Sequence, residues 1–247
     1  MKLSLYFVLF AFLVSCSSTD EFDTKTAEGA FKAAEKLEKD ELFEMAIKKY
    51  SEVKNRHPYS RFAVESELRI ADIHFKRENY AEARAAYQVF KDLHPTHKKS
   101  DYVTNQLALS YYHQLPSTID RDLSLALKAI QYFDEVMRTH PNSKYAKKAK
   151  KYRADLRTKL AEKELYIANF YMKKDMYLAA HQRFAGVVDS YSDVEDLIPK
   201  ALLGAGKSAA ENGDKPTAKQ FLDKLIKNYA NSEQADQAKE AAREYGL

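Results

Sequence analysis

The chain is poor in the residues that form disulfides, metal sites and tight turns. Cysteine occurs once, as Cys16, and glycine and proline occur six times each in 247 residues. A single thiol excludes an internal disulfide and a metal site built from several cysteines. The sequence contains no HExxH, GxSxG, Walker or GxGxxG pattern, and its glycines are too scattered for a phosphate-binding loop. We therefore expect a non-enzyme with no catalytic residue, no metal and no cofactor.

The charge of the chain is nearly balanced. Lys and Arg number 40 against 36 Asp and Glu, and the formal net charge of +4 is too mild to indicate a nucleic-acid partner. Alanine, glutamate, lysine, leucine and tyrosine dominate the sequence. Together with the scarcity of glycine and proline, this composition predicts a mostly helical protein.

The N-terminus resembles the export signal of a bacterial lipoprotein. A lysine precedes an apolar run of about a dozen residues, which is too short to span a membrane but typical of a signal peptide. The run ends in Leu13-Val14-Ser15-Cys16, which resembles a lipobox. The alternative is a plain signal peptide with an incidental cysteine.

The lipobox resemblance implies that residues 1–15 are removed and that Cys16 becomes the lipidated first residue. Residues 16–26 then form a polar tether, which reaches at most about 33–36 Å and keeps the folded body close to the membrane. Ser17, rather than aspartate, follows the cysteine. In lipoproteins this permits transport to the outer membrane.

Beyond residue 26 the chain repeats one pattern five times. A small residue is followed after four, three and four positions by an aromatic, an apolar and an aromatic or histidine residue, and proline follows in three copies. These offsets place each set on one face of a helix, and the proline marks its end. The sets are Ala46, Tyr50, Val53, His57, Pro58; Ala83, Tyr87, Phe90, His94, Pro95; Ala129, Phe133, Val136, His140, Pro141; Ala180, Phe184, Val187, Tyr191; and Ala218, Leu222, Leu225, Tyr229.

A second small residue lies twelve positions before most of the repeat alanines, which would let two antiparallel helices approach closely. These residues are Ala34, Ala71, Ala168 and Gly206, with Ala108 in the third repeat if its loop carries an insertion. The pattern resembles the tetratricopeptide repeat, although its early tryptophan and Leu-Gly pair are missing. We predict an all-α fold, a right-handed superhelical array of five helix–turn–helix repeats with a capping helix at 232–245.

Two intervals between repeats are longer than the others. The first contains a loop at 115–122, and the second lacks glycine and proline over 143–174, which predicts one unusually long helix. We expect residues 27–142 to form repeats 1–3 with a client-binding groove. Residues 143–247 would contain the long helix, repeats 4–5 and the capping helix.

The first helix of each repeat should line a concave groove. Its aromatic and acidic side chains suit an extended peptide, although a partly solvated face would look the same. On the repeat register these positions are Glu28, Phe31, Glu35, Glu65, Leu68, Asp72, Phe75, Tyr102, Asn105 and Tyr112.

A basic segment opens the long helix. It consists of Lys144, Lys147, Lys148, Lys150, Lys151, Arg153, Arg157 and Lys159, with Asp155 as the one acid among them. A solvated helix face is the first interpretation, and anionic lipid headgroups or an acidic partner come next.

The order of these parts resembles the BamD family of outer-membrane β-barrel assembly lipoproteins. The most specific stretches are His57-Pro58-Tyr59-Ser60, residues 92–103 and the run at 160–192. Two departures concern Ser192-Asp193, where the family has Pro-Asp, and the length of the loop at 115–122.

The resemblance implies a lipid-anchored scaffold on the periplasmic side of the outer membrane. Such proteins dock on the barrel-forming protein BamA through their C-terminal repeats, meet other assembly lipoproteins and receive unfolded outer-membrane proteins in the N-terminal groove. Carried onto this sequence, Arg183 and Tyr171 would face BamA, since an arginine fork can hold a carboxylate by two bonds. The alternatives are interhelix packing for Tyr171 and a solvated charge for Arg183.

Two other functions remain open at this point. A pilotin-like lipoprotein that assists secretin or pilus assembly could carry the same signal and repeats. A cell-wall enzyme or its regulator is a third possibility, because a scaffold fold serves many tasks.

Overall fold

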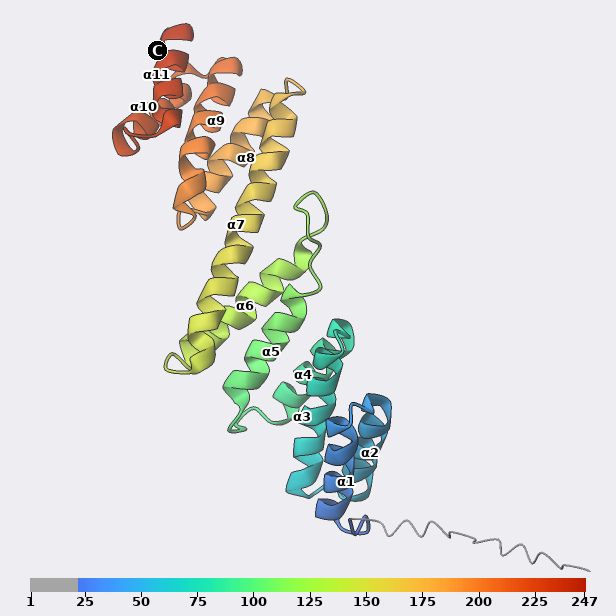
Figure 1. Cartoon of the computed structure of the whole chain (residues 1–247). Helices are drawn as coiled ribbons and strands as arrows, with labels where there is room; N and C mark the ends of the chain where they lie inside the picture. Colours follow the sequence, from blue (N-terminus) through green and yellow to red (C-terminus); the bar gives the residue numbers. More distant parts are fainter. Residues whose placement is uncertain (1–21) are drawn as a thin grey trace, which may run out of the picture. The chain divides into compact units, whose positions relative to one another are not determined.

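The computed structural model describes residues 22–247, so Cys16 and the expected signal peptide lie outside the described residues. The described chain is all-helical and contains no strand, which confirms the predicted all-α class (Figure 1). The helices are α1 (Ala27–Lys39), α2 (Phe43–Arg56), α3 (Arg61–Lys76), α4 (Tyr80–Leu93), α5 (Ser100–Tyr112), α6 (Ser124–Thr139), α7 (Lys144–Met172), α8 (Tyr177–Ser190), η1 (Glu195–Leu197), α9 (Ile198–Glu211), α10 (Lys215–Asn228) and α11 (Glu233–Glu244).

The chain divides into two compact units, which are described separately. The first unit ends at Ile73 and the second runs from His74 to Leu247. The boundary expected at 142–143 therefore lies inside the second unit, where α7 packs against both α5 and α6. The assignment of separate tasks to residues 27–142 and 143–247 stays a prediction.

Small residues bring the paired helices together, as the repeat pattern predicts. The repeat alanines and the earlier alanines are fully buried; they are Ala34, Ala46, Ala71, Ala83, Ala108, Ala129, Ala168, Ala180 and Ala218. Gly206 takes the same place in α9, where a Cβ atom would lie 2.6 Å from Leu222 Cδ2 on α10. Larger side chains at these positions would separate the helices of a pair.

The repeat aromatics form the core that these helices share. In the first unit Tyr50 and Phe31 lie in one cluster, with ring centroids 5.4 Å apart. In the second unit Phe133 stacks on Tyr152 of α7 at 5.5 Å. The repeated histidines His57, His94 and His140 each stand directly after a helix, as C-cap residues.

The longest helix, α7, has 29 residues and confirms the predicted extension. The hydroxyl of Ser143 caps its start by accepting a hydrogen bond from the Tyr145 amide. One end of α7 packs against α5 and α6, and the other against α8 and α9 (Figure 1). The expected loop at 115–122 lies between α5 and α6, and α11 takes the place of the expected capping helix.

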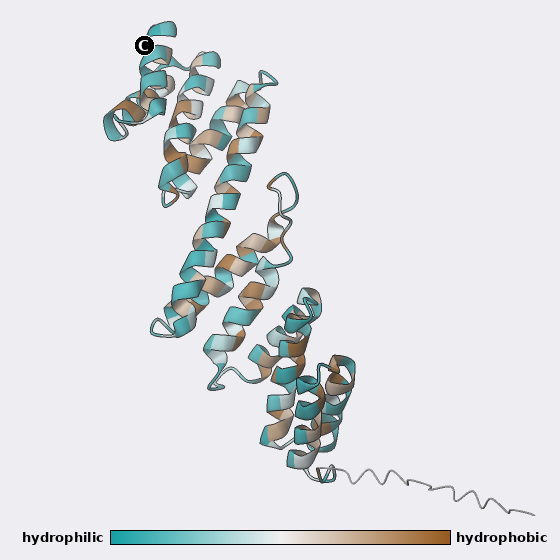
Figure 2. Ribbon diagram, viewed as in Figure 1, coloured by the Kyte–Doolittle hydropathy of each residue, from teal (hydrophilic) through white to brown (hydrophobic). Residues whose placement is uncertain are grey.

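The long helix α7 and the other described helices carry many hydrophilic residues. Figure 2 shows that α7 is hydrophilic along much of its length despite its size. Among residues 22–247, no helix combines the length and the apolar character needed to cross a bilayer.

Candidate partner-binding surfaces

Arg183 of α8 lies beside α7, where it meets a carboxylate of its own chain. Its Nη1 donates to Glu164 Oε2 at 2.8 Å, and this hydrogen bond raises the pKa of Arg183 above its ordinary value. The Arg183 side chain is 45% exposed, so part of its guanidinium fork still faces solvent. The arginine is therefore held in one orientation by α7 while keeping donors for another acceptor.

Tyr171 lies two turns along α7 from Glu164, on the same face of the helix. It is half-buried and packs against the core that α7, α8 and α9 share. This packing matches the alternative interpretation of Tyr171, and a role in partner binding stays a prediction.

Two exposed aromatic residues lie on the side of α7 that faces away from its buried residues. Tyr166 and Phe170 are one turn apart and are 54% and 52% exposed. Phe170 contacts Tyr171 edge-on at 5.9 Å, and Lys174 Nζ lies 6.0 Å from its ring centroid. Exposed large aromatics are typical of protein–protein contact sites. The sequence alone does not distinguish them as a surface, because aromatic residues at helical spacing also form the repeat core.

In the first unit, two of the residues predicted to line the groove are buried instead. Phe31 is 6% exposed and Leu68 is fully buried, because both turn toward neighbouring helices and pack in the core. Glu35 is part-exposed, with an oxygen 3.5 Å from Arg69 Nη2. Glu65 and Asp72 are half-buried. A client groove in this unit can therefore use the acidic positions but not Phe31 or Leu68.

A polar network lies beside these acids in the first unit. Tyr50 donates its hydroxyl to Glu38 Oε2 at 2.6 Å, and Arg69 Nε lies 3.4 Å from the same oxygen. Burial, and then the bond to Glu38, raises the pKa of Tyr50 well above its ordinary range. The network ties α1 to α2 and to Arg69 of α3.

In the second unit, the aromatic residues predicted to line the groove contact other residues of the chain. Phe75 packs edge-on against Tyr80 at 5.4 Å, and Tyr102 lies 5.6 Å from Tyr145. The Tyr112 hydroxyl donates to Asp155 Oδ2 of α7 at 2.9 Å, and burial raises the pKa of Tyr112. Asn105 is 2% exposed, which corrects its assignment to a solvent-facing groove position. Whether the part-exposed aromatics bind a client stays a prediction.

The basic segment of α7 splits into two groups. The five lysines Lys144, Lys147, Lys148, Lys150 and Lys151 are exposed. Arg153, Arg157 and Lys159 instead form ion pairs with Asp134, Asp193 and Asp155, respectively. The solvated-face interpretation therefore fails for this second group.

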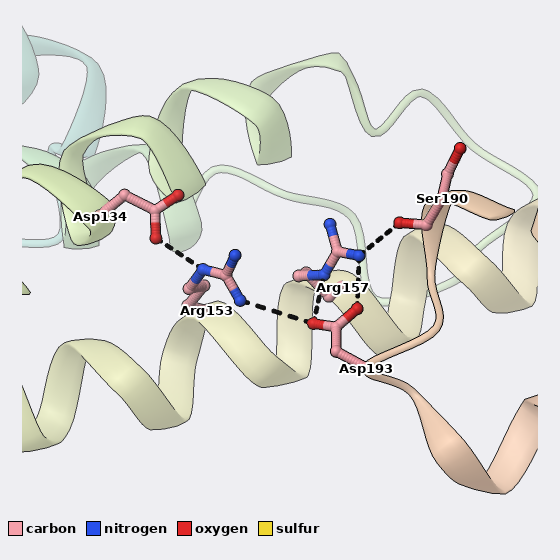
Figure 3. Close-up of polar contacts among 5 residues, drawn as sticks. All are labelled: Asp134, Arg153, Arg157, Ser190 and Asp193. Carbon is pink, nitrogen blue, oxygen red and sulfur yellow. Dashed lines mark hydrogen bonds and ion pairs between the residues drawn. The ribbon is translucent and has the colours of Figure 1, made fainter.

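Arg153 and Arg157 connect α7 to α6 and to the segment that follows α8 (Figure 3). Arg153 Nε donates to Asp134 Oδ1 of α6 at 2.6 Å, and its Nη1 lies 3.5 Å from Asp193 Oδ2. Arg157 holds Asp193 by two bonds, from Nε to Oδ2 at 2.6 Å and from Nη2 to Oδ1 at 2.5 Å. Its Nη2 also donates to the Ser190 carbonyl at the end of α8. We call Asp134, Arg153, Arg157, Ser190 and Asp193 the arginine clamp.

The arginine clamp should make stability depend on acidic pH. The bond from Arg157 lowers the pKa of Asp193 below its ordinary value, against the opposing effect of burial. A depressed carboxyl pKa contributes stability above the unfolded value of about 3.9, and that contribution is lost as the pH falls below it. We expect Asp193→Asn to lower the free energy of unfolding at pH 7 by about 1 kcal/mol, since the pair is partly exposed.

Urea unfolding at neutral and acidic pH measures this effect. The parent should lose stability relative to Asp193→Asn as the pH falls below about 4. Asp223→Asn, at an exposed ion pair within α10, is the matched control and should be nearly neutral. An equal pH dependence for Asp193→Asn and the parent would contradict a stabilising clamp.

Among the described residues, no cluster of three or more histidine, cysteine, aspartate or glutamate side chains could hold a metal ion. Arginine and exposed aromatic side chains, as at Arg183, Tyr166 and Phe170, are typical of protein–protein contact sites.

Comparison with known proteins identifies relatives along most of the chain. A family model described as outer membrane lipoprotein, YfiO, matches residues 23–202, and a tetratricopeptide repeat model matches residues 200–232. The outer membrane protein assembly factor BamD of Neisseria gonorrhoeae is 32% identical over 157 residues, covering 60% of this chain and 59% of that protein. BamD of Rickettsia prowazekii is 30% identical over 190 residues, covering 77% and 75%.

The match thus spans less than two thirds of the Neisseria protein. Among solved structures, the Pseudomonas aeruginosa pilF protein is similar at a TM-score of 0.37 and 16% identity, over 87% of this chain and 82% of that one. This likeness is too weak to bear on function.

Proposed function

The chain belongs to the YfiO family of outer membrane lipoproteins, and on that premise we propose that it is a scaffold of the outer-membrane β-barrel assembly machinery. The family model over residues 23–202 is the observation that carries this proposal. In this function the protein docks on the periplasmic domains of BamA and receives unfolded outer-membrane proteins for insertion. It acts by binding rather than by catalysis, alongside other assembly lipoproteins.

We further infer that acylated Cys16 anchors the protein in the outer membrane, with the helical body facing the periplasm. Family membership supports the association with the outer membrane. The lipobox, the short polar segment after it and Ser17 support the anchor and its destination.

The surface around Arg183 is the proposed BamA contact. Its exposed guanidinium donors can bind a carboxylate of the partner, while Glu164 fixes the side chain from within. Tyr166 and Phe170 supply exposed aromatic area on the same helix as Glu164. Arginine and exposed aromatic side chains are the residue types most often found at the energetic centre of an interface.

Reversing the charge at Arg183 tests this contact. Arg183→Glu removes the donors and places a second carboxylate beside Glu164, so it should repel an acidic partner group. We expect recovery of BamA with the tagged protein from detergent-solubilised membranes to fall about tenfold, or ~1.4 kcal/mol.

Two control variants separate the contact from general effects of charge. Glu164→Gln keeps the arginine and should still recover BamA, and Lys224→Glu makes a charge reversal on exposed α10. If Arg183→Glu recovers BamA as well as these controls, the assigned surface is wrong. Depletion of the protein tests the function itself: many outer-membrane barrels should be lost, whereas loss of one secretin alone would indicate a pilotin.

A further inference from the structure

A cavity of about 440 Å³ lies in the second unit. Four helices contribute to it: α7, α8, α9 and α11. On α9 the lining residues are Lys200, Leu203, Gly204 and Lys207, which recur at the spacing of one helix face. We call this cavity the lysine hollow.

The floor of the lysine hollow is apolar. The ring of Phe184, which is 3% exposed, lies against the α9 backbone, so that a Cβ atom on Gly204 would fall 2.5 Å from its Cε1. Leu165 and Met172 of α7 line the same space. An apolar side chain of a ligand could therefore be buried there.

Two lysines border this floor, and neither forms an ion pair with any residue from 22 to 247. Lys200 is exposed and Lys207 is half-buried. They stand two turns apart on α9, which separates them by about 10.5 Å along the helix axis. An extended segment rises about 3.3 Å per residue and its alternate side chains share one face, so carboxylates four residues apart, about 13 Å, lie within reach of the two flexible lysine side chains.

Side-chain amides complete the border of the hollow. Asn169 Nδ2 donates to the Leu165 carbonyl at 2.8 Å, and Gln237 Nε2 donates to Glu233 Oε1 at 2.9 Å. These bonds use the NH₂ groups and leave the two amide oxygens to accept backbone N–H groups from a bound segment. Gln234 adds a third amide from α11.

We propose that the lysine hollow binds an extended segment of a partner protein, with two carboxylates four residues apart and an apolar side chain midway between them. The carboxylates meet Lys200 and Lys207, the apolar side chain covers Phe184 and Leu203, and the amides bind the segment's backbone. This site goes beyond the proposed function, because Arg183 does not line it and because it prefers acidic sequence. The lysine side chains favour a negatively charged ligand. The apolar floor favours a ligand with an apolar side chain over a free anion.

Peptide binding to the full chain, reconstituted in nanodiscs, tests the proposal by fluorescence anisotropy. The probe is a short capped peptide with two glutamates four positions apart and a leucine midway between them. We expect the double variant Lys200→Gln/Lys207→Gln to weaken its binding by about tenfold or more. Leu203→Ala should weaken it several-fold through the lost apolar contact.

A control variant and a control peptide test whether binding depends on these two lysines and on the charge of the peptide. Lys219→Gln/Lys224→Gln removes two lysines from α10, outside the lysine hollow, and should leave the affinity unchanged. A peptide with glutamine in place of glutamate should bind at least about tenfold more weakly than the acidic one. The proposal is overturned if the acidic peptide does not bind, if both peptides bind equally, or if both double variants behave alike. Equal competition by free glutamate would also overturn it, since that outcome indicates a simple anion site.

Discussion

Replacing Phe184 by alanine is expected to lower the free energy of unfolding of the second unit by about 3–5 kcal/mol. Phe184 is a repeat aromatic of α8, is 3% exposed and belongs to the core that α7, α8 and α9 share. Its removal leaves a ring-sized cavity, which the rigid helix pairs can fill only partly. Urea unfolding followed by the helical circular dichroism signal measures the loss.

A second substitution shows whether the ring and the α9 backbone are coupled. Gly204→Ala places a methyl group 2.5 Å from Phe184 Cε1, so it should cost about 1–3 kcal/mol alone. In the Phe184→Ala background the obstruction is gone, and the same change should become neutral or stabilise by up to about 1 kcal/mol through helix propensity. The double-mutant cycle should therefore give a coupling of about 2 kcal/mol.

Gly186 offers the matched control on α8 itself. A Cβ atom there would meet nothing within 4 Å, so Gly186→Ala should stabilise by about 1 kcal/mol in both backgrounds. Additive effects of Phe184→Ala and Gly204→Ala would contradict the close contact between the ring and α9.

Replacing Cys16 by serine should move the protein from the outer-membrane fraction to the soluble periplasmic fraction. The hydroxyl cannot accept the thioether-linked lipid, and each lost buried methylene removes about 0.8 kcal/mol of membrane affinity. A single acyl chain anchors only marginally, so the several chains of a bacterial lipoprotein make this a change of many orders of magnitude. Fractionation followed by immunoblotting measures the shift.

The control for this experiment is Ser18→Ala, which changes the tether and leaves the lipobox intact. It should remain with the outer membrane. If Cys16→Ser also remains there, contacts with partner proteins rather than the lipid hold the protein at the membrane.

The sequence was sufficient to predict the helix pairs, the long α7 and the capping helix. These features rest on local periodicity: repeat residues at offsets of four, three and four share a helix face wherever the chain is helical. The small residues carried information of the same kind. Alanines at both repeat positions predicted close helix pairs, and Ala34 and Ala46 are indeed fully buried.

The assignment of groove residues was less successful for a physical reason. Core and groove positions lie on adjoining faces of the same helix, one residue step of about 100° apart. Phe31 and Leu68 fall on the buried side of that division, while Glu35 falls on the exposed side. Residue type does not distinguish the two faces, since aromatic and aliphatic side chains occur on both.

By itself, the sequence determined the helical repeats and the family resemblance, and it predicts the lipoprotein signal, because each depends on residues close together in the chain. The tertiary structure alone decided which basic residues of α7 are engaged, since Arg157 meets Asp193 across 36 positions of sequence. The tertiary structure also decided that the Phe184 ring packs against Gly204 and that Lys200 and Lys207 border an apolar cavity. Such contacts depend on how helices pack, and a pattern along one helix carries no information about the side chains that a neighbouring helix brings to it.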